Sequence, residues 1–165
     1  MLGCMSSDSI TSTLIFEPIP SRELQEIRAA GRDEAGNRLT VRAVTEGGDP
    51  LRCCLRETRP GDRVLLMAYT PPGTRGAYAE RGPLFIHADP CDGYPTPHVY
   101  PPGLRHRQQV VRGYDHHGRI ADGALADNGD HAIEVIREML ARPGVALVHL
   151  RNVGYGCYNF AVRRC

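Results

Sequence analysis

Proline and glycine divide this chain into short segments, which restricts the folds it can adopt. The sequence holds 18 glycines and 13 prolines in 165 residues, and its longest apolar run, 64–69, is only as long as a strand. Only two stretches, 21–30 and 129–141, carry apolar residues at helical spacing. A parallel sheet needs a crossover, usually a helix, between successive strands, and this chain has too few helices for that. The pattern therefore favours an α+β fold.

We expect one α+β domain over residues 14–165, with a mostly antiparallel sheet and two helices packed on one side of it. Ser21 is expected to cap the first helix and Gly31 to end it, while Asn128 begins the second. Residues 1–13 are polar and aperiodic, which predicts a disordered or extended tail. Strands are predicted at 14–16, 39–44, 51–55, 63–69, 84–88, 107–114, 145–151 and 157–163.

The composition excludes several classes of function. A formal charge of +1 provides no basic excess for nucleic acid, and no apolar run is long enough to cross a membrane. All 20 basic residues are arginine, and the last serine is Ser21, so a Schiff-base lysine, a phosphate-loop lysine and a serine nucleophile in the domain body are excluded. Without a recognisable export signal we expect a cytoplasmic protein with reduced thiols; its oligomeric state stays open.

The cysteine pair Cys53-Cys54 is the first candidate for chemistry. In a strand over 51–55, Cys53 would face the core and Cys54 would share the other face with Arg52 and Arg56. Two guanidinium groups beside a thiol favour the thiolate, which is both a nucleophile and a metal ligand. Cys54 is therefore the expected reactive thiol, unless the arginines only point into solvent.

His87 is the second candidate, at the predicted end of a strand and just before a proline-rich segment, 89–104. Histidine is suited to proton transfer near neutral pH, and Cys91 follows it at a spacing that lets both side chains reach one centre. The alternative is a histidine that only caps a strand end.

Arginine and tyrosine residues nearer the C-terminus could form a binding wall. Arg112 and Arg151 lie on predicted strands, and arginine binds carboxylate or phosphate with two parallel hydrogen bonds. Tyr155 stands between two glycines, which can let the backbone approach a ligand, and Cys157 follows. Salt bridges and a simple turn are the alternatives.

Several linked motifs resemble a bacterial family known as domain of unknown function 1203. They are Pro50-Leu51-Arg52-Cys53-Cys54-Leu55-Arg56, Pro60-Gly61-Asp62, Gly82-Pro83-Leu84-Phe85-Ile86-His87-Ala88 with Cys91, Arg112-Gly113-Tyr114-Asp115 and Tyr155-Gly156-Cys157-Tyr158-Asn159-Phe160. The similarity spans roughly residues 14–164 and implies no reaction, so every site rests on the residues themselves.

Three functions remain open. The leading one is a small enzyme without a cofactor, in which Cys54 is the nucleophile or redox thiol and His87 its acid or base. In it a small anionic substrate is held by Arg52, Arg56, Arg112, Arg151 and Tyr155. The second is a zinc or other soft-metal site made from Cys54, His87, Cys91 and Cys157. The third is a non-catalytic module that binds an anion or a peptide.

Overall fold

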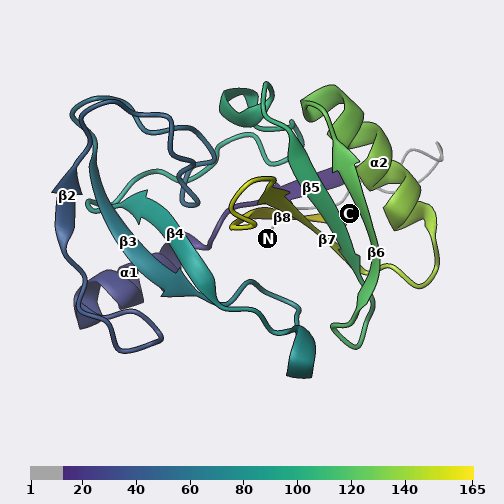
Figure 1. Ribbon diagram of the computed structural model, residues 1–165, viewed down its shortest axis with the longest axis horizontal. Coiled ribbons are helices and arrows are strands. Elements are labelled where there is room, and N and C mark those ends of the chain that lie inside the picture. Colours follow the sequence, from purple (N-terminus) through teal and green to yellow (C-terminus); the bar gives the residue numbers. More distant parts are fainter. Residues whose placement is uncertain (1–12) are drawn as a thin grey trace.

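A computed structural model describes residues 13–165 as two antiparallel sheets with two α-helices (Figure 1). The strands are β1 (Leu14–Glu17), β2 (Val41–Ala43), β3 (Arg63–Tyr69), β4 (Gly82–His87), β5 (Gln109–Tyr114), β6 (Ile120–Ala126), β7 (Leu147–Asn152) and β8 (Tyr158–Arg164). The helices are α1 (Ser21–Ala30) and α2 (Gly129–Ala141), with short 3₁₀ helices η1 (Gly76–Tyr78) and η2 (Pro102–Leu104). The predicted α+β class is confirmed. Nearly all of the tail expected over 1–13 lies outside the described residues.

The larger sheet has five strands in the order β1-β8-β7-β5-β6, and one of its faces packs against α2. Because side chains alternate along a strand, Val111, Val148 and Leu150 share the face that contacts Ile136 and neighbouring residues of α2. All of these side chains are buried. This packing fixes α2 and leaves the opposite face of the sheet for the rest of the molecule.

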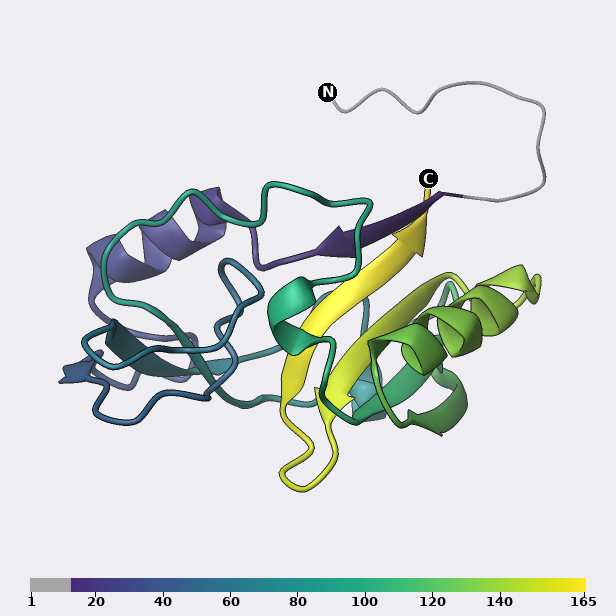
Figure 2. The same cartoon turned by 90° about the horizontal axis from the view of Figure 1, so that it is seen from above.

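The opposite face packs against the smaller sheet, whose order is β2-β3-β4. Tyr114 and Leu147 of the larger sheet share this second core with Met67 and Ile86 of the smaller sheet and with Leu24 of α1. Helices α1 and α2 therefore belong to different cores, and Figure 2 shows them at opposite ends of the molecule. The expectation that both helices pack on one side of one sheet was wrong, because the strands divide into two sheets.

The helix ends agree with the sequence signals in all but one detail. Gly31 adopts φ 63°, the left-handed conformation that ends α1. Oδ1 of Asn128 accepts hydrogen bonds from the backbone N–H groups of Asp130 and His131 at 3.0 and 3.1 Å, as an N-cap should. Ser21 does not cap α1 but is its first residue, with no side-chain cap. Within the described part of the chain, no helix is long and apolar enough to span a bilayer.

Residues 51–55 form a tight turn and not the predicted strand. The backbone N–H of Leu55 donates to the carbonyl of Leu51 at 3.0 Å, and Leu55 takes a positive φ of 56°. One isolated bridge joins Pro50 to Glu57 across the two ends of the turn, and a second joins Leu51 to Phe85 of β4. These bridges fix the turn in place beside β4. The period-2 alternation used to separate Cys53 from Cys54 therefore does not apply.

Candidate metal centre

Four metal-ligating side chains meet near the end of β4: Cys53, Cys54, His87 and Cys91. Their ligand atoms all lie within 4.8 Å of one another. Sγ of Cys53 is 3.9 Å from Sγ of Cys54 and 3.4 Å from Nδ1 of His87, and Sγ of Cys54 is 3.8 Å from the same nitrogen. A tetrahedral zinc site places two sulfur ligands about 3.8 Å apart and a sulfur and an imidazole nitrogen about 3.5 Å apart. The cluster has the dimensions of such a site.

The turn at 51–55 explains how two adjacent cysteines reach one point. In an extended strand their side chains would face opposite ways, but here the backbone reverses between Leu51 and Leu55. The backbone N–H of Arg52 donates to the carbonyl of Phe85 at 3.1 Å, which fixes the turn beside β4. Both thiols therefore lie next to the last residue of that strand.

His87 and Cys91 come from the end of β4 and the connection that follows it. The backbone N–H of His87 donates to Sγ of Cys53 at 3.4 Å, and the carbonyl of His87 accepts two bonds from Arg28 of α1, at 3.2 and 3.0 Å. Four residues later the chain has turned enough to bring Cys91 back to the same centre. Two regions of the chain, 53–54 and 87–91, thus supply the four side chains of the cluster.

Arg56 and Asp62 lie behind His87. Asp62 accepts two parallel bonds from the guanidinium of Arg56, at 2.7 and 3.1 Å, and its Oδ1 is 3.9 Å from Nε2 of His87. The bond from Arg56 lowers the pKa of Asp62 to about 2, so this carboxylate is ionised at neutral pH. Metal-bound histidines usually donate their second N–H to such a carboxylate.

The three thiols do not ionise equally. Hydrogen bonds with Cys54 and Cys91, together with burial, raise the pKa of Cys53. The pKa of Cys54 is also raised: its bond with Cys53 lowers it, but its bond with Cys91, burial and the charge of Cys91 outweigh that effect. Bonds from Cys53 and Cys54 lower the pKa of Cys91. Among the three thiols, Cys91 is therefore the one that ionises most readily in the absence of a metal.

Two of the predicted substrate-binding arginines have structural partners. Arg52 is buried, its Nε donates to the carbonyl of Tyr158 at 2.7 Å, and a second bond goes to the carbonyl of Pro50. Burial lowers the pKa of Arg52 to about 10. Arg56 is engaged with Asp62 and His87. Because Arg52 points into the core, the two flanking cations expected to favour a Cys54 thiolate are not both present.

The remaining predicted residues gather elsewhere. Arg112, Arg151, Tyr155 and Cys157 line a cleft of about 410 Å³ that also borders Gly82, Pro83 and Leu84 at the start of β4. His87 ends that strand, and five residues of strand span roughly 17 Å. The structure therefore does not bring Arg112 and Arg151 to Cys54 and His87. In the predicted metal set, Cys53 takes the place that was expected for Cys157.

Sequence reasoning assigned Cys53 to the core and missed it as a ligand. Cys53 belongs to both the core and the cluster, since the residue is only 1% exposed while its sulfur lies among the four candidate ligand atoms. The available signal was the Cys-Cys pair itself, placed between Pro50 and the Pro60-Gly61 turn, where a reversal of the chain could aim both thiols one way.

A family model described as a protein of unknown function (DUF1203) matches residues 48–164. The chain belongs to this family. All four members of the cluster and all the residues of the arginine cleft named above fall inside the matched region. Searches among curated proteins and among solved structures found no match. The function of this DUF1203 member must therefore be argued from the site.

Proposed function

We propose that this protein binds one zinc ion through Cys53, Cys54, His87 and Cys91, and that the ion is structural. The spacing of the ligand atoms carries the proposal: all lie within 4.8 Å of one another, although they come from two regions of the chain, 53–54 and 87–91, that are far apart in sequence. Three sulfurs and one imidazole nitrogen form a recognised zinc set and suit a soft, tetrahedral ion. Oxygen-preferring ions such as Mg²⁺ and Ca²⁺ are disfavoured by the same donors.

A structural role follows from the number and origin of the ligands. Catalytic zinc sites usually have three protein ligands and one open position, whereas four protein ligands close the coordination sphere. Two of these ligands come from the irregular segment 50–58 and one from the connection after β4, where few backbone ladders fix the chain. The ion would join these segments to the end of β4.

The second core shows why such a link matters. Cys53 is a buried member of this core, while Cys54 and Cys91 pack against it. The metal would therefore hold the turn at 51–55 and the connection after β4 against this core.

Cobalt substitution with matched cysteine variants tests the proposal. Co²⁺ bound by thiolates in a tetrahedral site gives intense visible and near-ultraviolet absorption, which zinc should abolish by competition. We expect one Co²⁺ per chain in the wild type and in Cys157→Ser, and weak, altered or absent absorption in Cys53→Ser and Cys91→Ser. Equal spectra in Cys53→Ser and the wild type, or loss of the signal in Cys157→Ser, would overturn the ligand assignment.

A further inference from the structure

Two arginines of the larger sheet share one carboxylate. Arg112 of β5 lies opposite His149 of β7, and Arg151 is two residues further along β7, so both arginines project from the face turned toward the smaller sheet. Glu80, in the connection between β3 and β4, accepts from Nη1 of Arg112 at 3.0 and 3.1 Å and from Nη2 of Arg151 at 2.5 Å. One carboxylate thus bridges two guanidinium groups.

The group has two guanidinium cations for one carboxylate, and one guanidinium nitrogen has no hydrogen-bond acceptor. The Arg151 side chain is 8% exposed, and its Nη1 is buried without a hydrogen-bond partner. Arg112 is also largely covered, at 24% exposed, whereas Glu80 is 46% exposed. Burying a guanidinium N–H without an acceptor is costly, so an additional acceptor at this position would stabilise the group.

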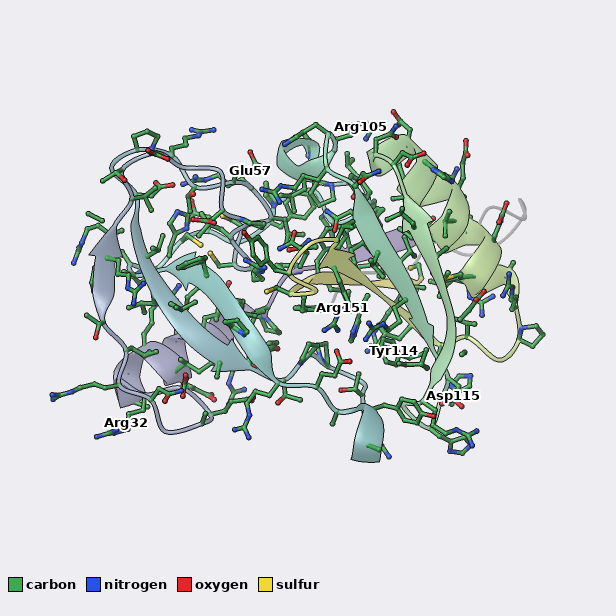
Figure 3. The ribbon with its side chains drawn as sticks, in the orientation of Figure 1. Arg32, Glu57, Arg105, Tyr114, Asp115 and Arg151 are labelled. Carbon is green, nitrogen blue, oxygen red and sulfur yellow. The ribbon has the colours of Figure 1, made fainter. Side chains whose placement is uncertain are left out.

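The cleft around the two arginines suits a small molecule. Its volume of about 410 Å³ lies within the usual range of ligand sites, roughly 300–1,000 Å³. Aromatic and apolar side chains of Tyr69, Leu84 and Tyr158 form part of its wall, and Tyr155, 92% exposed, is also one of its lining residues. Figure 3 shows Arg151 in the middle of the molecule, between the two sheets.

We propose that this cleft binds a small organic carboxylate with an aromatic or apolar body, and that Glu80 occupies the carboxylate position when no ligand is present. A carboxylate already fits between the two guanidinium groups: Nη1 of Arg112 contacts both of its oxygens, and Nη2 of Arg151 contacts one of them. An incoming carboxylate would take these donors, and the half-exposed Glu80 would turn into solvent. The site lies at the opposite end of β4 from the metal centre and does not depend on it.

Calorimetric titration with benzoate tests the proposal, with benzyl alcohol and inorganic phosphate as comparison probes. We expect benzoate to bind and benzyl alcohol not to bind. Glu80→Gln removes the competing charge and should tighten benzoate binding roughly two- to fivefold, the range expected for a partly exposed ion pair. Arg112→Gln should weaken it at least about tenfold, because a charge-assisted pair of bonds is lost.

The result would overturn the proposal if benzoate and benzyl alcohol bound alike, if Glu80→Gln bound benzoate no more tightly, or if Arg112→Gln had no effect. Tighter binding of phosphate than of benzoate would overturn the choice of a carboxylate. NMR of the arginine Nε–Hε groups in the wild type needs no variant: benzoate should shift the signals of Arg112 and Arg151 but not that of Arg163, and unmoved signals count against the site. Metal content measured in parallel should be the same in all three proteins.

Discussion

Nη2 of Arg56 lies 2.8 Å from Nε2 of His87, on the imidazole nitrogen that does not face the thiols. Arginine can only donate, so in this arrangement Nε2 accepts and the proton of the neutral ring is on Nδ1. A metal bound at Nδ1 moves that proton to Nε2, where Oδ1 of Asp62, 3.9 Å away, is the nearby acceptor. Arg56 as placed suits the Nδ1–H tautomer, whereas a metal-bound ring needs Arg56 to withdraw from Nε2 so that this N–H can donate to Asp62.

Asp62→Asn should weaken zinc binding without abolishing it. Loss of an outer-shell carboxylate typically costs about 10–100-fold in metal affinity. Competition with a chromophoric chelator measures the change. Asp122→Asn, which removes a carboxylate paired with Arg142 far from the cluster, is the matched control and should leave the affinity unchanged. Equal affinities for Asp62→Asn and the wild type would contradict a role for Asp62.

Removing the metal should loosen two segments selectively. Amide hydrogen exchange should become faster in residues 50–58 and 88–96 after treatment with a strong chelator, because these segments supply three of the four ligands. The buried apolar side chains of helix α2 all lie in the other core, so this helix should keep its protection. Uniform acceleration, or none, would argue against a local structural role for the ion.

Arg52→Met should destabilise the fold while the metal ligands remain in place. Methionine can occupy the buried volume, but the carbonyls of Tyr158 and Pro50 would lose their donor. Leaving a buried acceptor unpaired costs about 1–3 kcal/mol. Urea unfolding of the zinc-loaded protein measures the loss, and Arg22→Met on the exposed face of α1 is the control, which should change stability very little. A loss as small as that of the control would contradict the structural role of Arg52.

His149 should make the protein less stable in acid. Burial, together with the charges of Arg151, Arg112 and Arg163, lowers the pKa of His149 to about 3, against the opposing effect of its bond with the carbonyl of Pro72. Its Nε2 is 2.9 Å from the carbonyl of Pro72, which suits a neutral ring donating that proton. The unfolded chain binds a proton near the ordinary histidine pKa of 6.5 and the folded chain does not, so stability present above pH 6.5 is lost as the pH falls toward 3.

Comparison of the wild type with His149→Gln isolates this effect. Below about pH 6 the wild type should lose stability relative to the variant by up to about 1.4 kcal/mol per pH unit. Urea unfolding at several pH values between 7 and 5 measures the free energy of unfolding of both proteins. The pH effects of the metal and of the carboxylates are common to both, so they cancel in the difference. Parallel pH dependences would show that His149 accepts a proton in the folded state.

The sequence predicted those elements whose signals are local. Helix α2 was found from its Asn128 cap and apolar stripe, and β3 from its apolar run between turn residues. Strand β6 was missed because it lies at the edge of its sheet and is mostly exposed, so Ile120–Ala126 carries no alternating apolar pattern. The division into two sheets depends on pairings between distant strands, which periodicity does not report.

The candidate site was predicted only in part for the same reason. The spacing of His87 and Cys91 along the chain correctly indicated that they could meet. The strand expected over 51–55 wrongly separated Cys53 from Cys54, because alternation fits those five residues even though hydrogen bonds to Arg56 and Phe85 hold them in a turn. Arg52 was expected to flank Cys54 and to help hold an anionic substrate, and only the fold shows that it donates to the backbone carbonyls of Tyr158 and Pro50.

Zinc K-edge X-ray absorption of the protein as purified, with zinc per chain measured on the same sample, tests the central claim most directly. The proposed ligands predict one zinc per chain, with three sulfurs at about 2.3 Å and one nitrogen at about 2.0–2.1 Å. Cys53→Ser should lose the metal or replace one sulfur by a lighter atom. A reduced, folded protein that holds no zinc and takes none up, or a shell made only of nitrogen and oxygen, would contradict the account.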